Sequence, residues 1–172
     1  MQRWNKIKNG SIYFLYLFDA QITKKMLKIG ILGGGQLGRM LLQSAANYNV
    51  ETYVLESGAN PPASSLWHHF IQGDIRDYNA VYQFGKKVDV LTIEIENVNL
   101  AALFKLEEEG LKIYPRPHAL QVIQDKGLQK DFYVKHGIST SKYVLINNKE
   151  EILTSGMLMP LVQKLRSGGY DG

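Results

Sequence analysis

The run Leu27–Leu32 and the glycine-rich stretch that follows it, GGGQLGRM, constrain the fold of this chain most strongly. Such a near-continuous apolar run is typical of a buried parallel strand. The three glycines indicate a tight turn, and the residues after them predict a helix over Gln36–Asn47. The apolar residues of that helix expected to pack on the strand are Leu37, Met40, Leu41 and Ala45. A strand, a glycine turn and a helix in this order predict an α/β fold with a parallel sheet.

Strands and helices continue to alternate as far as about residue 118. Further strands are expected at Thr52–Leu55, His68–Gln72, Val88–Ile95 and Lys112–Tyr114. One helix is expected after Asp77, which can cap it, and another over Asn99–Glu109, where Gly110 is a stop signal. Alternation at this spacing indicates a parallel sheet with right-handed crossovers.

The pattern changes near residue 118. Residues Ala119–Gly137 predict helices, and Asn148–Leu153 predicts a short helix that begins at an asparagine. The segments Tyr143–Ile146 and Leu161–Leu165 predict strands on either side of that short helix. We therefore expect a domain boundary at residues 115–125, with one domain over 27–118 and a second unit over 119–172.

The net charge of +4, from 20 basic and 16 acidic residues, is concentrated at the N-terminus. Residues 1–25 already carry that charge, because they hold Arg3, Lys6, Lys8, Lys24 and Lys25 against Asp19. The rest of the chain is balanced, so the basic charge does not indicate a nucleic-acid-binding face.

Within this basic segment lies the short apolar run Ile12–Phe18. It is far shorter than the roughly 20 residues of a membrane span, and no small-residue cleavage site follows it. We interpret residues 1–26 as a disordered or non-native extension, with Met26 as the natural start. The alternative interpretations are an additional strand or an arm that binds a partner.

The chain contains no cysteine. Disulfides, thiolate metal sites and a cysteine nucleophile are therefore excluded. The absence of cysteine agrees with a reducing cytoplasm, which is the expected location.

The glycines Gly33, Gly35 and Gly38 form the pattern GxGxxG between a strand and a helix. Glycine lets the backbone approach a phosphate, whose charge meets free N–H groups at the helix N-terminus. Glu56 lies at the end of the second strand, where a dinucleotide fold places its ribose-binding acid. On spacing alone the pattern favours an NAD(P) site, and the alternative is a packing turn without a ligand.

Three further stretches are not explained by a nicotinamide site. In TIEIENV, alternation places Glu94 and Glu96 on one face of a strand end, where a polar ligand binds or the strand emerges into solvent. Lys126 follows Gln124 and Asp125 at the start of the second unit. Lys164 precedes the glycine-rich loop 167–172, an arrangement suited to nucleotide polyphosphates or to an exposed turn.

In order along the chain, GILGGGQLGRM, TIEIENV, QDKGLQKDFYVKHGIST and SGGYDG resemble the 5-(carboxyamino)imidazole ribonucleotide synthase family. This is the ATP-dependent subunit of phosphoribosylaminoimidazole carboxylase, in the ATP-grasp superfamily. The resemblance covers Leu27 to Gly172, and the related formate-dependent glycinamide ribonucleotide transformylase shares the architecture. It implies a Rossmann-like pre-ATP-grasp domain followed by the start of a truncated ATP-grasp domain.

The resemblance also implies ligands and residues. The aminoimidazole ribonucleotide site would contain Gly35, Gln36, Leu37, Glu96 and Asn97. The ATP site would contain Lys126, Lys164, Gly168, Gly169, Tyr170, Asp171 and Gly172. ATP and Mg²⁺, not NAD, would serve a reaction that phosphorylates bicarbonate to carboxyphosphate and carboxylates the exocyclic amine of the ribonucleotide. The full enzyme would be a homodimer that acts in purine biosynthesis, with no nucleic acid or membrane partner.

The sequence departs from the family at its end, because the glycine loop stops at Gly172. The adenine-binding segment, the metal ligands and the later phosphate-binding residues are expected beyond that point, and no catalytic or metal-binding residue is assigned within the chain. We therefore expect an N-terminal portion that is inactive alone. The alternatives are the NAD(P)-binding domain of a dehydrogenase and a non-enzymatic dimerisation module.

Overall fold

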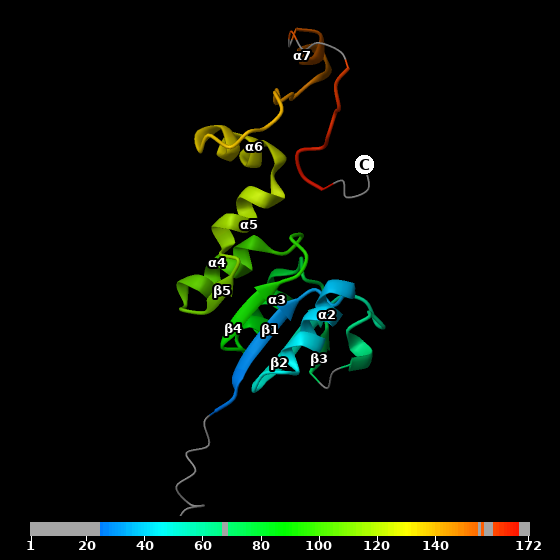
Figure 1. Cartoon of the computed structure of the whole chain (residues 1–172), viewed down its shortest axis with the longest axis vertical. Coiled ribbons are helices and arrows are strands. Elements are labelled where there is room, and N and C mark those ends of the chain that lie inside the picture. The colour runs from blue at the N-terminus through cyan, green and yellow to red at the C-terminus, as the bar shows by residue number, and fades with distance from the viewer. Residues whose placement is uncertain (1–24, 67–68, 155, 157–159, 169–172) are drawn as a thin grey trace, which may run out of the picture.

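The computed structural model describes residues 25–66, 69–154, 156 and 160–168 (Figure 1). The first unit contains β1 (Leu27–Leu32), α2 (Gln36–Ala45), β2 (Val50–Glu56), the short 3-10 helix η1 (Ser64–Leu66), β3 (Phe70–Gln72), α3 (Tyr78–Gly85), β4 (Val90–Ile93), α4 (Leu100–Glu108) and β5 (Lys112–Tyr114). The second contains α5 (Pro117–Gln124), α6 (Lys126–Lys135) and α7 (Lys149–Thr154).

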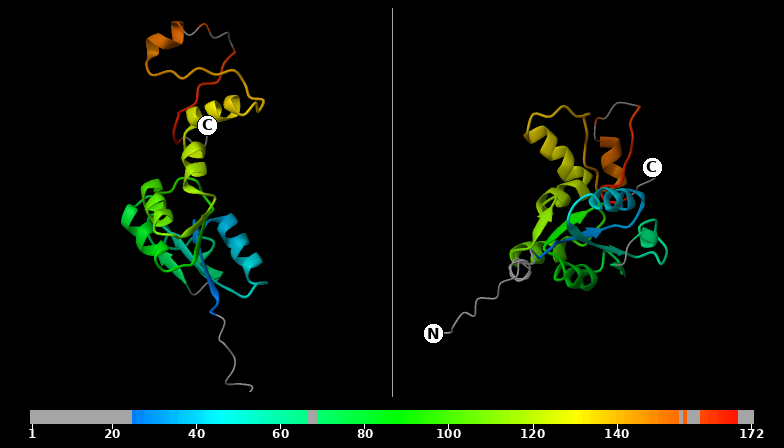
Figure 2. Two further views of the ribbon diagram at one scale, coloured as in Figure 1. Left: turned by 90° about the vertical axis from the view of Figure 1, so that its left-hand side faces the viewer. Right: turned by 60° about the horizontal axis from the view of Figure 1, so that its bottom comes forward.

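The five strands form one parallel sheet in the order β3-β2-β1-β4-β5, which confirms the predicted α/β class. Helix α2 covers one face of the sheet, and α3 and α4 cover the other (Figure 2). A large apolar core that includes Phe84, Leu103 and Leu106 fills the side of α3 and α4. A smaller apolar core forms around Leu42 of α2. Because both faces of β1 are covered by helices, its sequence is almost continuously apolar.

Local signals in the sequence set the ends of several helices. The Asp77 carboxylate accepts a hydrogen bond from the Ala80 N–H at 2.7 Å and begins α3. Asn99 caps α4 in the same way through the Ala102 N–H at 2.9 Å. Gly110 follows α4 with a φ of 93°, which glycine adopts without strain. The predicted starts of both helices and the predicted stop of α4 are thus confirmed.

The predicted packing face of α2 is wrong. Leu37, Met40 and Leu41 are 62%, 59% and 41% exposed, while Gly38 and Leu42 are buried. A Cβ on Gly38 would lie 2.5 Å from the Gly33 carbonyl oxygen, so the helix meets the turn backbone to backbone. This close approach turns the face of Gly38 and Leu42 toward the sheet and leaves the larger side chains outside.

Three predicted strands differ from the structure. Strand β4 ends at Ile93, so Glu94 and Glu96 lie in the loop after it and not on a strand face. The segments Tyr143–Ile146 and Leu161–Leu165 form no strand, because no described residue pairs with their backbone. The prediction for His68 and the interpretations of residues 1–24 fall outside the described residues.

The helices predicted after residue 118 are present as α5 and α6, with Asp125 as the extended break between them. Asn148 caps α7 through the Glu151 N–H at 3.0 Å, as its sequence indicates. The domain boundary itself stays a prediction. Among the helices of the described residues, none is long and apolar enough to cross a membrane.

Candidate functional site

The loops that follow β1 and β4 lie side by side at the carboxyl edge of the sheet. The two strands are paired in parallel, and Leu32 at the end of β1 is opposite Ile93 at the end of β4. The glycine turn therefore begins beside Glu94. Ligands of open α/β sheets bind at this edge, so the residues predicted from the sequence on both loops lie where a ligand can bind.

Packing explains why the turn needs its first two glycines. Gly33 has a φ of 109°, and a Cβ there would overlap the Glu94 carboxylate oxygen Oε2. A Cβ on Gly34 would lie 3.0 Å from Cβ of Glu56. At Gly35, in contrast, the nearest atom would be Oε1 of Glu94 at 3.5 Å, an ordinary contact. The space beside Gly35 is thus bounded by a carboxylate.

Helix α2 begins at Gly35 without a capping side chain among the described residues. The first N–H groups of a helix have no acceptor within the helix, and no capping side chain among the described residues accepts from those of Gln36 and Leu37. Both side chains are exposed. The turn therefore offers backbone donors to a ligand at the edge of the sheet.

The Glu56 carboxylate is engaged by the protein itself, unlike the ribose-binding acid of a dinucleotide site. Its Oε2 accepts the Gly34 N–H at 3.0 Å, and its Oε1 accepts the N–H and hydroxyl of Ser57 at 2.7 and 2.8 Å. Partial burial alone would raise the pKa of Glu56, but these donors outweigh it and hold the pKa below its usual value. The carboxylate fixes the turn, so the spacing that suggested NAD(P) has a structural explanation.

Glu94 is the acidic residue that faces the glycine turn. Neither of its carboxylate oxygens takes part in a hydrogen bond within the described part of the chain. Burial raises the pKa of this carboxyl, and the charges of Glu56 and Glu96 raise it further. Glu94 is thus an acceptor held in an unfavourable environment, the arrangement expected where a ligand supplies the missing donors.

Glu96 and Asn97 lie two and three residues further along the same loop, with exposed side chains. Of the two carboxylates, only Glu96 was predicted in the ribonucleotide pocket from the sequence, and Glu94 was not. The parallel register of β1 and β4 places Glu94 next to Gly33, and only knowledge of that register could have ranked the two carboxylates.

The predicted ATP residues are brought together in part. The Lys126 ammonium at the start of α6 donates to the Gly168 carbonyl oxygen at 2.7 Å. Lys164 is exposed and not in a strand. The predictions for Gly169, Tyr170, Asp171 and Gly172 fall outside the described residues.

An ion pair supports this second contact region. Nε of Arg166 donates to both oxygens of Asp125 at 2.8 Å, and the Lys126 N–H donates to the Arg166 carbonyl at 2.9 Å. The Asp125 carboxylate also caps α6 through the N–H groups of Gly127 and Leu128. The Arg166 guanidinium holds the pKa of Asp125 below its usual value. The segment before the glycine loop is therefore fixed against the start of α6.

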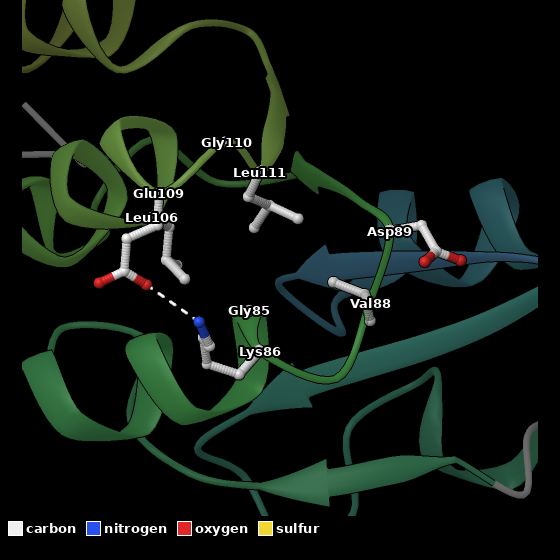
Figure 3. Close-up of a pocket in the computed structure, with 8 residues that line it drawn as sticks. All are labelled: Gly85, Lys86, Val88, Asp89, Leu106, Glu109, Gly110 and Leu111. Carbon is white, nitrogen blue, oxygen red and sulfur yellow. Dashed lines mark hydrogen bonds and ion pairs between the residues drawn. The ribbon is translucent and has the colours of Figure 1, made fainter.

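A cavity of about 250 Å³ lies at the amino ends of the strands, opposite the glycine turn (Figure 3). It is lined by residues that precede β4 and β5, among them Val88, Asp89 and Leu111. Lys86 and Glu109 close one side of it with an ion pair of 3.0 Å. Because it is remote from the glycine turn and its charges are already paired, we do not assign the ligand site to it.

The described residues contain no group of three or more His, Asp or Glu side chains that could hold a metal ion. In nucleotide sites Mg²⁺ is usually held by one or two carboxylates together with water and substrate phosphates, and we assign none of these ligands to the described residues.

Comparisons with known proteins agree with this geometry. The sequence model of a family described as the ribonucleotide synthetase preATP-grasp domain matches residues 26–124. The chain is 39% identical over 156 residues to the N5-carboxyaminoimidazole ribonucleotide synthase of Brucella melitensis, covering 90% of this chain and 43% of that protein.

Solved structures give the same result. The N5-carboxyaminoimidazole ribonucleotide synthetase of Thermotoga maritima superposes with a TM-score of 0.77 and 38% identity, over 84% of this chain and 40% of that one. The synthase of Aspergillus clavatus was solved in complex with ADP and 5-aminoimidazole ribonucleotide. It superposes with a TM-score of 0.68 and 38% identity, over 76% of this chain and 35% of that one. The chain spans between 26% and 43% of the length of the curated relatives it matches.

Proposed function

Because the chain belongs to the ribonucleotide synthetase preATP-grasp family, we propose that it forms the ribonucleotide-binding part of an N5-carboxyaminoimidazole ribonucleotide synthase. In this proposal the carboxyl edge of the sheet binds 5-aminoimidazole ribonucleotide, the ligand named for the Aspergillus clavatus structure. The observation that carries the proposal is the unpartnered Glu94 carboxylate beside the uncapped N-terminus of α2.

The chemistry of this edge selects which part of the ligand it holds. Burial raises the pKa of Glu94, and the charges of Glu56 and Glu96 raise it further, so this edge of the sheet is acidic. A phosphate would be repelled there, whereas a sugar hydroxyl can donate to a carboxylate and accept from an N–H at the same time. We therefore assign the ribose hydroxyls to Glu94 and the amides of Gln36 and Leu37, rather than the phosphate.

The remaining predicted residues surround that position. Gly35 gives the ligand access to the backbone, since a Cβ there would narrow the space beside Glu94. Glu96 and Asn97 would form the exposed side of the pocket. The proposed ribonucleotide site thus comprises Gly35, Gln36, Leu37, Glu94, Glu96 and Asn97.

We assign ATP to the second contact region. Lys126 offers a compact positive charge suited to a phosphate, and it already binds the backbone of the glycine loop at Gly168. Lys164 is exposed and able to reach a ligand. We also propose residues 169–172 for the ATP site, as the sequence predicts. In this arrangement nucleotide phosphates replace the Gly168 carbonyl as the partner of the Lys126 ammonium.

In the complete enzyme, the γ-phosphoryl group of ATP would pass to a bicarbonate oxygen with release of ADP. The resulting carboxyphosphate would break down to CO₂ and phosphate, and the amine of the ribonucleotide would add to CO₂ and lose a proton to give the carbamate. Mg²⁺ would neutralise phosphoryl charge, but none of its ligands is proposed on the described residues. The homodimer also stays a proposal for the complete enzyme.

Calorimetric titration of the chain tests the proposal. We expect binding of 5-aminoimidazole ribonucleotide and no binding of NADH. Glu94→Gln should weaken ribonucleotide binding at least about tenfold, the typical effect of losing a hydrogen bond to a charged acceptor. Glu108→Gln, an exposed carboxylate at the end of α4, is the matched control. Equal affinity of Glu94→Gln and wild type would refute the assignment of Glu94.

ATP turnover provides a second test. We expect the purified 172-residue chain to release no ADP when it is given ATP, bicarbonate and the ribonucleotide. Turnover that depends on both substrates would contradict the expectation that the chain is inactive alone.

A further inference from the structure

Gln124, the last residue of α5, joins this helix to the loop that carries Glu94 and Glu96. Its side-chain nitrogen donates to the Glu96 carbonyl oxygen at 2.6 Å and to the Val98 carbonyl oxygen at 3.0 Å. A primary amide has two N–H donors, so both are used. The reverse orientation would set the amide oxygen against two carbonyl oxygens, which fixes the side chain in the observed direction.

The two carbonyls belong to a turn that is already partly ordered. The Val98 N–H donates to the same Glu96 carbonyl at 2.8 Å, and the Asn99 N–H donates to Ile75 at 2.9 Å. Val98 is buried, which anchors the end of the turn in the core. Gln124 holds the middle of the turn, immediately after the carboxylates that face the ligand.

The next residue holds a different segment. Asp125 caps α6 and binds Arg166, and the Lys126 N–H binds the Arg166 carbonyl. Two consecutive residues thus hold the loop after β4 and the segment that leads to the glycine loop. Asp125 is the single extended residue between α5 and α6, so the two sets of contacts are adjacent along the chain.

We propose that Gln124 is a positioning residue that couples the ribonucleotide loop to the nucleotide-binding start of α6. The proposal rests on the function proposed above. The side-chain amide sets the position of Glu94 and Glu96 relative to Lys126, so that the ribonucleotide and the nucleotide phosphates are held at a defined separation. Occupation of one loop then orders the other.

Amide hydrogen exchange of the ligand-free chain tests the coupling directly. Gln124→Met keeps the length of the side chain and removes both donors. We expect exchange about tenfold faster at Val98 and Asn99, the scale of losing one or two hydrogen bonds, and about threefold faster at Lys126 and Gly127. Gln121→Met, on the exposed side of the same helix, should leave all four rates unchanged. Unchanged rates at Lys126 and Gly127 in Gln124→Met would overturn the coupling.

A ligand experiment separates this inference from the proposed function. In the wild type, 5-aminoimidazole ribonucleotide should slow exchange at Lys126 and Gly127; in Gln124→Met it should not, even at saturation. Slowing of equal size in both proteins would overturn the proposal. If the wild type does not bind the ribonucleotide, the proposed function fails, and the ligand-free rates still decide whether Gln124 couples the two segments. Gln124→Glu, which sets a carboxylate against the two carbonyls, must reproduce the ligand-free result.

Discussion

Replacing Gly38 by alanine tests whether close packing of α2 on the glycine turn determines the geometry of the site. The new Cβ would lie 2.5 Å from the Gly33 carbonyl oxygen, a backbone atom that cannot rotate away. Overpacking costs about 1–3 kcal/mol, and because this contact is rigid we expect a cost of about 3 kcal/mol. The higher helix propensity of alanine offsets about 1 kcal/mol of that cost. The net effect is a loss of about 2 kcal/mol in the free energy of unfolding.

Gly58→Ala is the matched control. Its Cβ would meet only Pro61, at 3.7 Å, and Gly58 does not have a positive φ. The same change should here stabilise the chain by about 0.4–1 kcal/mol, because it restricts the unfolded state. Urea unfolding of the two variants and the wild type gives both free energies. A Gly38→Ala variant as stable as the wild type would refute the packing argument.

Three further predictions concern charge and packing. Glu94→Gln should be more stable than the wild type at pH 7 and equally stable below pH 4.5. The reason is that the raised pKa of Glu94 opposes folding only once the carboxyl is ionised. Urea unfolding at the two pH values measures the difference in the free energy of unfolding. Asp125→Asn should destabilise the chain at pH 6. The difference in stability from the wild type should shrink as the pH falls below 3.8, because the stability that comes with the lowered pKa of Asp125 is lost when the carboxylate is protonated. Thermal unfolding of both proteins across this pH range checks the direction of the change. Leu42→Ala should cost about 2–5 kcal/mol and Met40→Ala under about 1, the reverse of what the predicted face of α2 implies. Equal losses at the two positions would contradict the observed face.

The sequence predicted those parts of the fold that depend on neighbouring residues along the chain. A near-continuous apolar run located β1, and the caps Asp77 and Asn99 located the starts of α3 and α4. These signals act within a few residues, so a single sequence contains them.

The errors lie where distant segments decide the outcome. The exposed face of α2 follows from the contact of Gly38 with Gly33, which amphipathic periodicity does not encode. The segment Tyr143–Ile146 has the composition of a strand but no described partner to pair with. An apolar β-branched run forms a strand only beside another strand.

The candidate site shows the same division. The glycine turn and TIEIENV were identified from sequence, but the choice between Glu94 and Glu96 depended on where β4 stops relative to β1. The spacing of Glu56 favoured a dinucleotide until its carboxylate was found bonded to Gly34 and Ser57. Gln124 carried no signal in the sequence, because its partners are backbone carbonyls of another loop.

Mapping of the ribonucleotide on the chain by amide chemical shifts tests the central claim most directly. Addition of 5-aminoimidazole ribonucleotide should shift the amide resonances of Gly35, Gln36, Leu37 and residues 94–97. The cavity near Lys86 and Glu109 should be unaffected. Shifts confined to that cavity, or shifts at the glycine turn with NADH and none with the ribonucleotide, would contradict the account.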